Sequence, residues 1–162
     1  MLFQKGAPRF KRLCKLLEEA LIESSFEHNT GGHESRIIIF CLHKTQARKI
    51  GKDLKNKADI DDIVLEGDMS QEARVDATTA FRNGLSGKVL VATDLTERGL
   101  DFNVSHVFNY SLGISIESYI CQFGRMGRAG RYGVSHTFVV KGVDENFTPE
   151  LVLVLRKASQ LV

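Results

Sequence analysis

Residues 36–42 read RIIIFCL, a short and almost wholly apolar run that is rich in β-branched side chains. Such a run is typical of a strand buried on both faces of a parallel sheet. Apolar residues at three- and four-residue spacing predict an amphipathic helix over residues 8–27, before this strand, and a second helix is predicted over about residues 45–57. The polar, glycine-bearing segment 28–35 (HNTGGHES) is predicted to be the loop that joins the first helix to the strand.

The same alternation of strand and helix continues along the chain. Further strands are predicted over residues 63–67, 87–93, 106–111 and 135–140, and further helices over residues 70–82, 115–123 and 148–159. Ser70 and Ser115 are predicted to be the N-caps of two of these helices. The alternation predicts a single α/β domain over residues 1–162, with a mainly parallel sheet and helices on both faces. Ligands are expected at the carboxyl ends of the strands.

Composition limits the class of protein. The 162 residues are 43% hydrophobic and 26% charged, which excludes a disordered or fibrous chain, and no apolar run is long enough to cross a bilayer. The net charge of +2 is too small to indicate nucleic-acid binding by itself. The three cysteines form no CxxC pair and the five histidines no ligand spacing, so we expect an intracellular protein with reduced thiols, no metal site and no membrane contact.

Residues 119–133, YICQFGRMGRAGRYG, are the most informative for function. Glycines recur at every third position from 124 to 133, and an arginine directly follows each of the first three. Glycine lets a backbone approach a ligand closely, and guanidinium groups bind phosphate oxygens in pairs. The pattern predicts a polyphosphate site; the alternative interpretation is a flexible basic loop with surface arginines.

GRMGRAGR, at residues 124–131, resembles the last signature motif of the DEAD-box RNA helicases, HRIGRTGRxGR. Four further segments resemble motifs of the same family in the same order. RIIIFCLHK resembles the strand and loop of motif IV, and LEGDMSQEARVDATTAFRNG (65–84) resembles HGDxxQxxRxxxxxxFRxG. VLVATDLTERGLDF (89–102) resembles motif V, LVATDVAARGIDI, and HVFNYSLGISIESYI (106–120) is similar to VINYDLPxxxExYIHR. The resemblance spans nearly the whole chain.

The resemblance implies a RecA-like, P-loop NTPase-type fold that lacks its own phosphate loop, as in the second domain of a two-domain helicase core. The sequence contains no GxxxxGK[ST] loop and no DEAD tetrapeptide. ATP and Mg²⁺ are therefore expected to be bound mainly by an N-terminal RecA-like domain of a longer protein. This domain alone is expected to be inactive, whereas the full-length protein would couple ATP hydrolysis to RNA unwinding or to remodelling of RNA–protein complexes.

By the same resemblance, Arg125 and Arg128 would be catalytic arginine fingers that reach the γ-phosphate across the interdomain cleft. Asp101 would accept a hydrogen bond from the ATP ribose, Arg98 would link the ATP cleft to the RNA side, and Gly99 would also contact the cofactor. The alternative interpretation of Asp101 and Arg98 is an ion pair that stabilises a local turn.

The resemblance also implies a set of residues that bind the RNA backbone without reading its sequence. They are His43, Gly67, Asp68, Gln71, Arg74, Thr93 and Asp94. Without the family context, Gln71 and Arg74 would be interpreted as a solvated helix face, and Asp68 and Ser70 as ordinary helix capping. Phe81 is predicted to be a core residue.

Several residues depart from the family pattern. Glu97 replaces an alanine and could compete for Arg98, and Glu66 replaces a histidine and would repel RNA if it pointed towards it. The other departures are Leu42 and His43 for Asn-Thr, Cys121 and Gln122 for His-Arg, and Met126 for Thr.

The departures leave three hypotheses open. The first is a divergent ATP-dependent RNA helicase. The second is a catalytically weakened domain that acts as an RNA- or protein-binding scaffold, and the third is an α/β adaptor whose basic loop binds a free nucleotide. The sequence also leaves open whether the protein has protein regulators, and whether it acts in the nucleus, the cytoplasm or an organelle.

Overall fold

The computed structural model describes residues 2–3, 7–29, 36–84, 87–93, 104–113, 115–123 and 133–157. Its strands are β1 (Leu2–Phe3), β2 (Ile37–Cys41), β3 (Asp62–Leu65), β4 (Val89–Thr93), β5 (His106–Asn109) and β6 (Val134–Val139). Its helices are α1 (Ala7–Asn29), α2 (Lys44–Ala58), α3 (Gln71–Asn83), α4 (Ile116–Phe123) and α5 (Thr148–Lys157).

The strands form one sheet in the order β1-β6-β5-β2-β4-β3, and every neighbouring pair is parallel. The predicted α/β class and parallel sheet are therefore confirmed. β2 lies at the centre, between β4 and β5, and all five of its residues are buried. This position explains why residues 36–42 have no polar alternation.

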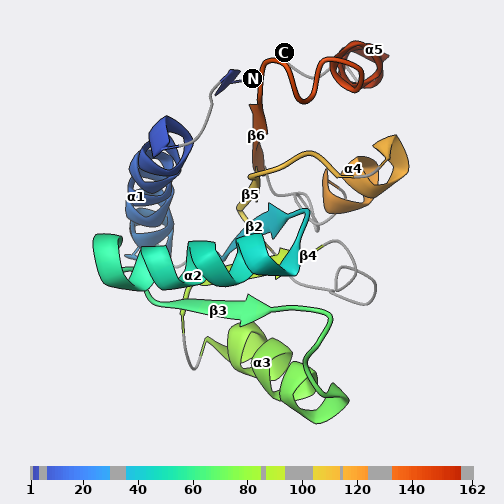
Figure 1. The fold of residues 1–162 in the computed structure, drawn as a ribbon. Helices are drawn as coiled ribbons and strands as arrows, with labels where there is room; N and C mark the ends of the chain where they lie inside the picture. The colour runs from blue at the N-terminus through green and yellow to red at the C-terminus, as the bar shows by residue number, and fades with distance from the viewer. Residues whose placement is uncertain are drawn as a thin grey trace.

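Helices cover both faces of the sheet (Figure 1). Alternate residues of β2 point to opposite faces: Ile37 and Ile39 pack in one apolar cluster with α1 and α2, whereas Ile38 and Phe40 pack in another with Phe81 of α3. Phe81 is completely buried, which confirms its predicted place in the core. Burying a side chain of this size contributes roughly 1.5–3 kcal/mol to the stability of the fold. Because the two clusters use alternate residues of β2, they determine which helices cover which face of the sheet.

Most elements begin and end within two residues of the predicted bounds, and three differences stand out. The first helix continues through His28 and Asn29, which we predicted to lie in a loop. β3 begins at Asp62 and ends at Leu65, because residues 66–69 leave the ladder in a turn. The two-residue strand β1, which pairs with β6, was not predicted, since two residues are too few to show a periodicity.

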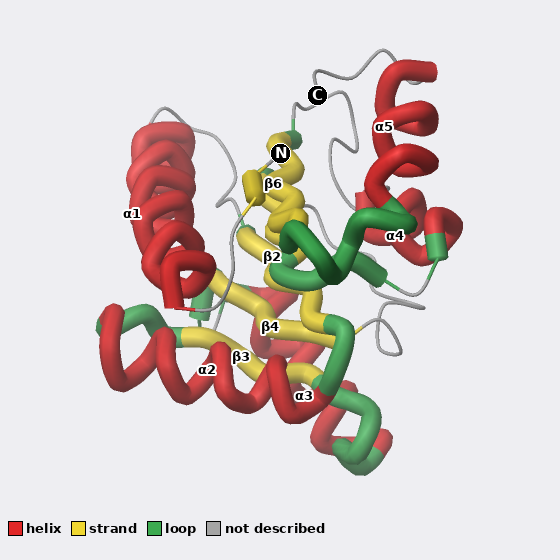
Figure 2. Tube along the Cα trace, turned by 45° about the horizontal axis from the view of Figure 1, so that its top comes forward, coloured by secondary structure: helices red, strands yellow, loops and turns green. Residues whose placement is uncertain are grey.

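The parallel direction of the strands places their carboxyl ends at one edge of the sheet, from which α2 and α3 depart (Figure 2). The turn after β2 is joined to the end of β5 at this edge. Ser111 Oγ accepts a hydrogen bond from the Leu42 amide at 2.8 Å and donates one to Gln46 Oε1 at 2.6 Å. These two bonds fix the start of α2 against the sheet.

Within the described part of the chain, no helix is both long enough and apolar enough to span a membrane.

Candidate functional site

The carboxyl ends of β3, β4 and β2 lie side by side. Thr93, the last residue of β4, is paired with Cys41 of β2, and Ala92 is paired with Leu65, the last residue of β3. The loops that follow these strands therefore leave the same edge of the sheet. Thr93 itself is only 4% exposed.

His43 is the N-cap residue of α2 at this edge. Its carbonyl oxygen accepts hydrogen bonds from the amides of Gln46 and Ala47, both at 3.0 Å. Its side chain makes no capping hydrogen bond and is exposed, so the imidazole ring is available to a ligand.

The start of α3 is held against the turn that follows β3. Ser70 Oγ accepts a hydrogen bond from the Ala73 amide at 3.2 Å, which confirms Ser70 as the N-cap. Arg74 Nη2 lies 3.4 Å from the carbonyl oxygen of Gly67, to which it donates. Arg74 is half-buried and therefore does not lie on a fully solvated helix face, whereas Gln71 is exposed. The hydrogen bond places two of the predicted RNA residues, Gly67 and Arg74, in direct contact.

Glu66, which stands where the family has a histidine, is directed towards α2. Its Oε1 atom accepts a hydrogen bond from Arg48 Nε at 2.7 Å and lies 2.7 Å from Arg48 Nη2. The Glu66 side chain is only 11% exposed, and its Oε2 atom is buried with no hydrogen-bond partner in the described part of the chain. The carboxylate therefore faces a guanidinium group and not open solvent.

Asp68 completes an ion-pair cluster at the same edge. Its Oδ2 atom lies 2.7 Å from Lys44 Nζ and 3.3 Å from Arg48 Nη2. The hydrogen bond from Lys44 is the main reason that the pKa of Asp68 lies below its usual range. The hydrogen bond to Glu66 in turn raises the pKa of Arg48. Because Lys44, Arg48 and Asp68 are each 52% exposed, we expect the cluster to orient these side chains more than it stabilises the fold.

Lys44 and Arg48 of α2 were not among the site residues predicted from the sequence. These two cations are four residues apart on α2, a spacing that puts them on one face of the helix. That spacing is a local signal that the two cations share one face of α2, whereas their contacts with Glu66 and Asp68 join segments 18 to 24 residues apart and leave no local signal.

A second group of polar contacts positions α4, which leads into the glycine and arginine segment. Asn109 is fully buried and its Nδ2 atom donates to Thr137 Oγ1 at 3.3 Å. The Tyr119 hydroxyl lies 3.0 Å from the same Thr137 oxygen. At the start of the helix, the Ser118 amide donates to Ser115 Oγ at 3.3 Å, as expected of an N-cap.

The remaining predicted residues lie outside the described part of the chain, or have side chains that it does not describe. For the ATP site and the end of motif V these are Asp94, Arg98, Gly99, Asp101, Arg125 and Arg128, and for the departures they are Glu97, Cys121, Gln122 and Met126.

The residues that the structure does describe contain no group of three His, Cys, Asp or Glu side chains that could hold a metal ion.

The model of the helicase conserved C-terminal domain family matches residues 9–130 of this chain. This is a C-terminal helicase domain of the DEAD-box family. The DEAD-box domain is 36% identical to the ATP-dependent RNA helicase DBP3 of Lodderomyces elongisporus over 94% of its own length and 27% of the relative's. It is also 36% identical to the DEAD-box ATP-dependent RNA helicase 5 of Arabidopsis thaliana, over 95% of the chain and 27% of the relative.

Solved structures of DEAD-box proteins share the fold of this domain. The RNA helicase Prp28 of Chaetomium thermophilum, bound to ADP, is 33% identical and superimposes with a TM-score of 0.79 over 98% of this chain and 36% of its own. Dbp5 of S. cerevisiae, bound to RNA and ADP BeF3, is 30% identical with a TM-score of 0.77, over 93% of this chain and 37% of its own. The domain thus spans about a quarter of the curated relatives, and the RecA-like fold is confirmed.

Proposed function

We propose that this domain is the C-terminal half of the ATP-hydrolysing core of an RNA helicase, and that it closes on an N-terminal RecA-like domain of the same protein when ATP and RNA bind. The observation that carries the proposal is the meeting of three motif segments at the carboxyl edge of β3, β4 and β2, in a chain of the DEAD-box family. The proposal includes an intracellular site of action, in the nucleus or the cytoplasm.

RNA would be held at this edge through its phosphates and sugars. The first turn of α3 presents backbone amides, and Gln71 and Arg74 add polar and cationic groups beside them. Thr93, Asp94 and His43 would contact the same strand of RNA from the ends of β4 and β2. Such contacts carry no base information, so we expect binding that does not depend on the RNA sequence.

ATP would bind in the cleft between the two domains, with Arg125 and Arg128 supplying positive charge to the γ-phosphate and with Asp101, Arg98 and Gly99 beside the nucleotide. Magnesium would be held by the N-terminal domain, and we assign no step on this chain to the ion.

The proposal is tested by the ATPase rate of the full-length protein with and without single-stranded RNA. We expect RNA to stimulate hydrolysis, and Arg128→Ala to lower the stimulated rate by about 10³-fold or more, the usual contribution of an arginine finger. Arg156→Ala, which removes an exposed arginine on α5, is the matched control and should leave the rate unchanged. An unchanged rate in Arg128→Ala would contradict the proposal.

A second candidate function is a binding scaffold without turnover. It is favoured by the ion pairs of Lys44 and Arg48 with Asp68 and Glu66, because these pairs neutralise two cations at the proposed RNA edge. RNA or protein binding by a full-length protein that hydrolyses no ATP under any RNA condition would establish this candidate instead.

A further inference from the structure

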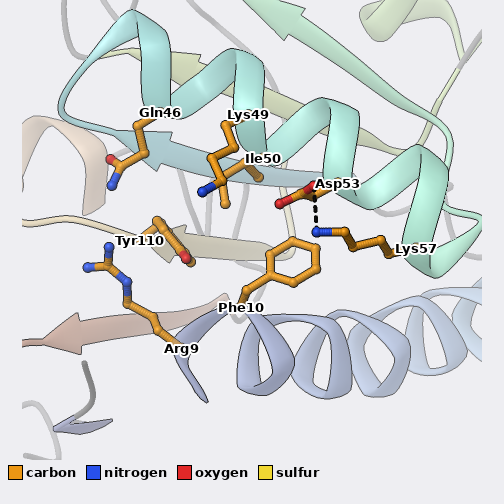
Figure 3. Close-up of a pocket in the computed structure, with 8 residues that line it drawn as sticks. All are labelled: Arg9, Phe10, Gln46, Lys49, Ile50, Asp53, Lys57 and Tyr110. Carbon is orange, nitrogen blue, oxygen red and sulfur yellow. Dashed lines mark ion pairs between the residues drawn. The ribbon is translucent and has the colours of Figure 1, made fainter. Parts of the chain in front are cut away.

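A cavity of about 370 Å³ opens between α1 and α2 (Figure 3), and none of the residues that we assign to RNA or ATP lines it. Its volume is within the range of about 300–1,000 Å³ that is typical of small-molecule sites. It is lined by residues of α1 and α2 and by Tyr110, which directly follows β5.

The inner wall of the cavity is apolar and aromatic. Ile50 and Tyr110 are 3% and 5% exposed, and both belong to the core cluster beneath α1 and α2. Phe10 of α1 packs against the same cluster, and the rings of Phe10 and Tyr110 both face the space below α2 (Figure 3). The wall therefore offers two aromatic rings and a branched aliphatic side chain to a flat apolar group.

One end of the cavity is electrically neutral. Lys57 Nζ lies 2.9 Å from Asp53 Oδ1, one turn earlier on α2, and 5.8 Å from the centre of the Phe10 ring. Asp53 is the only acidic residue among the described residues that line the cavity, and this pair neutralises it.

The other end carries two positive charges. The guanidinium carbon of Arg9 lies 4.2 Å from the centre of the Tyr110 ring, and the Nε atom of Arg9 is buried with no hydrogen-bond partner among the described residues. Lys49 projects from α2 into the same end and forms no ion pair within the described part of the chain (Figure 3). Two cations thus face this end of the cavity, and the described residues place no carboxylate there.

Gln46 adds a further donor at this end. Its Oε1 atom already accepts the hydrogen bond from Ser111, so the side-chain amide group is held in one orientation. The amide nitrogen then points towards the space above Tyr110 and Arg9 (Figure 3). The side chains of Arg9, Lys49 and Gln46 therefore present donors and no free carboxylate to a bound group.

We infer that this cavity binds an aryl phosphate, with the ring against Phe10, Ile50 and Tyr110 and the phosphate between Arg9, Lys49 and Gln46. A phosphate monoester carries about two negative charges at neutral pH, which matches the two cations, and its oxygens accept hydrogen bonds only. A free aryl phosphate and a phosphorylated tyrosine side chain of a partner protein share this chemistry. The site uses none of the residues that we assign to RNA or ATP.

The test is a titration of the 162-residue chain with 1-naphthyl phosphate, followed by the backbone amide signals of Phe10, Ile50 and Tyr110 in heteronuclear NMR spectra. We expect saturable shifts of these signals, and at least about tenfold weaker binding of both 1-naphthol, which lacks the charge, and inorganic phosphate, which lacks the ring. Equal binding of inorganic phosphate, or shifts spread evenly over the surface lysines, would overturn the proposal.

A pair of variants separates this site from general attraction to a basic helix. Lys49→Gln removes one cation of the cavity at an exposed position, and we expect it to weaken binding of 1-naphthyl phosphate about tenfold. Lys52→Gln removes an exposed lysine of the same helix outside the cavity and should leave the affinity unchanged. Equal affinities of the two variants would overturn the proposal.

The source of the ligand is distinguished by comparing free phosphotyrosine with a peptide that contains it. Tighter binding of the peptide assigns the site to a phosphorylated partner protein, and equal or weaker binding assigns it to a free aryl phosphate. Failure of both to shift the amides of the cavity would overturn the proposal.

Discussion

At the scale of single residues, Glu66 and Arg48 form one of the two shortest ion pairs at the proposed RNA edge, with 2.7 Å between Glu66 Oε1 and Arg48 Nη2. We predict that Glu66→Gln tightens RNA binding at low salt, because it leaves Arg48 with Asp68 as its only anionic partner in the described cluster. A unit charge at contact distance in water is worth about 1 kcal/mol, so the gain should be up to about fivefold. Fluorescence anisotropy with a labelled single-stranded RNA measures it.

The matched control is Asp59→Asn, which removes one negative charge at the C-cap of α2, the end opposite Lys44. Asparagine tolerates the left-handed conformation of this residue, whose φ is 52°. An equal gain in both variants would mean that only the net charge matters, and no gain in Glu66→Gln would mean that Arg48 does not contact RNA.

The environment of Asp62 disfavours the charged form of its carboxyl group. Burial within β3 raises its pKa to about 6 from an ordinary value of 3.8. Because the pKa is higher in the folded chain, the stability that Asp62 contributes is fully present below about pH 4 and is lost as the pH rises through 6. The shift of about two units corresponds to at most about 3 kcal/mol at neutral pH.

We therefore predict that Asp62→Asn raises the melting temperature at pH 7.5 and has little effect near pH 4. Thermal unfolding followed by circular dichroism across this pH range provides the measurement. Asp61→Asn, at the exposed neighbouring position, is the control and should show no such pH dependence. A stabilisation by Asp62→Asn that is equal at both pH values would contradict the explanation.

At the scale of elements, the sequence predicted most strands and helices because each has a strong local signal. Local patterns predicted the buried run of β2, the alternating clusters that face α1, α2 and α3, and the N-caps Ser70 and Ser115. The contacts of Glu66 with Arg48 were not predictable from such patterns, because they join the loop after β3 to the first turns of α2. Asp62 is a polar residue at the very start of β3, and the same lack of local signal explains why the strand was predicted to begin one residue later.

The packing of α2 against β3 depends on Gly51. A Cβ atom at this position would collide with the Val64 side chain and would lie 2.6 Å from Asp62 Oδ2. Alanine is favoured over glycine in a helix by about 1 kcal/mol, but overpacking against a stiff β-branched side chain costs about 1–3 kcal/mol. We predict that Gly51→Ala lowers the free energy of unfolding by up to about 2 kcal/mol, as measured by urea denaturation.

Lys52→Ala, at the exposed next position of α2, reports the effect of helix propensity without the collision. We expect it to leave the stability nearly unchanged. A gain in stability in Gly51→Ala would show that Val64 and Asp62 move aside at no cost.

At the scale of the whole molecule, the net charge of +2 gives only weak general attraction to RNA. RNA binding at the proposed edge must therefore come from a few cations in fixed positions, of which Arg74 is held against Gly67 by its hydrogen bond. The affinity of a protein for single-stranded nucleic acid falls with salt, and each phosphate contact contributes about 0.7 to the slope of log affinity against log salt concentration. Substituting one cation at a time therefore counts the phosphate contacts, because each contact that is lost reduces this slope.

We predict that Arg74→Ala in the full-length protein reduces the size of this slope by about 0.7 and weakens binding to the same extent for polyuridylate and polyadenylate. Arg74→Lys keeps the charge, so it should keep the slope even if the hydrogen bond to Gly67 is lost. Arg82→Ala, at the other end of α3, should leave the slope unchanged. An unchanged slope in Arg74→Ala would mean that Arg74 only supports the turn after β3, and loss of binding to one homopolymer alone would mean that this edge contacts bases rather than the backbone.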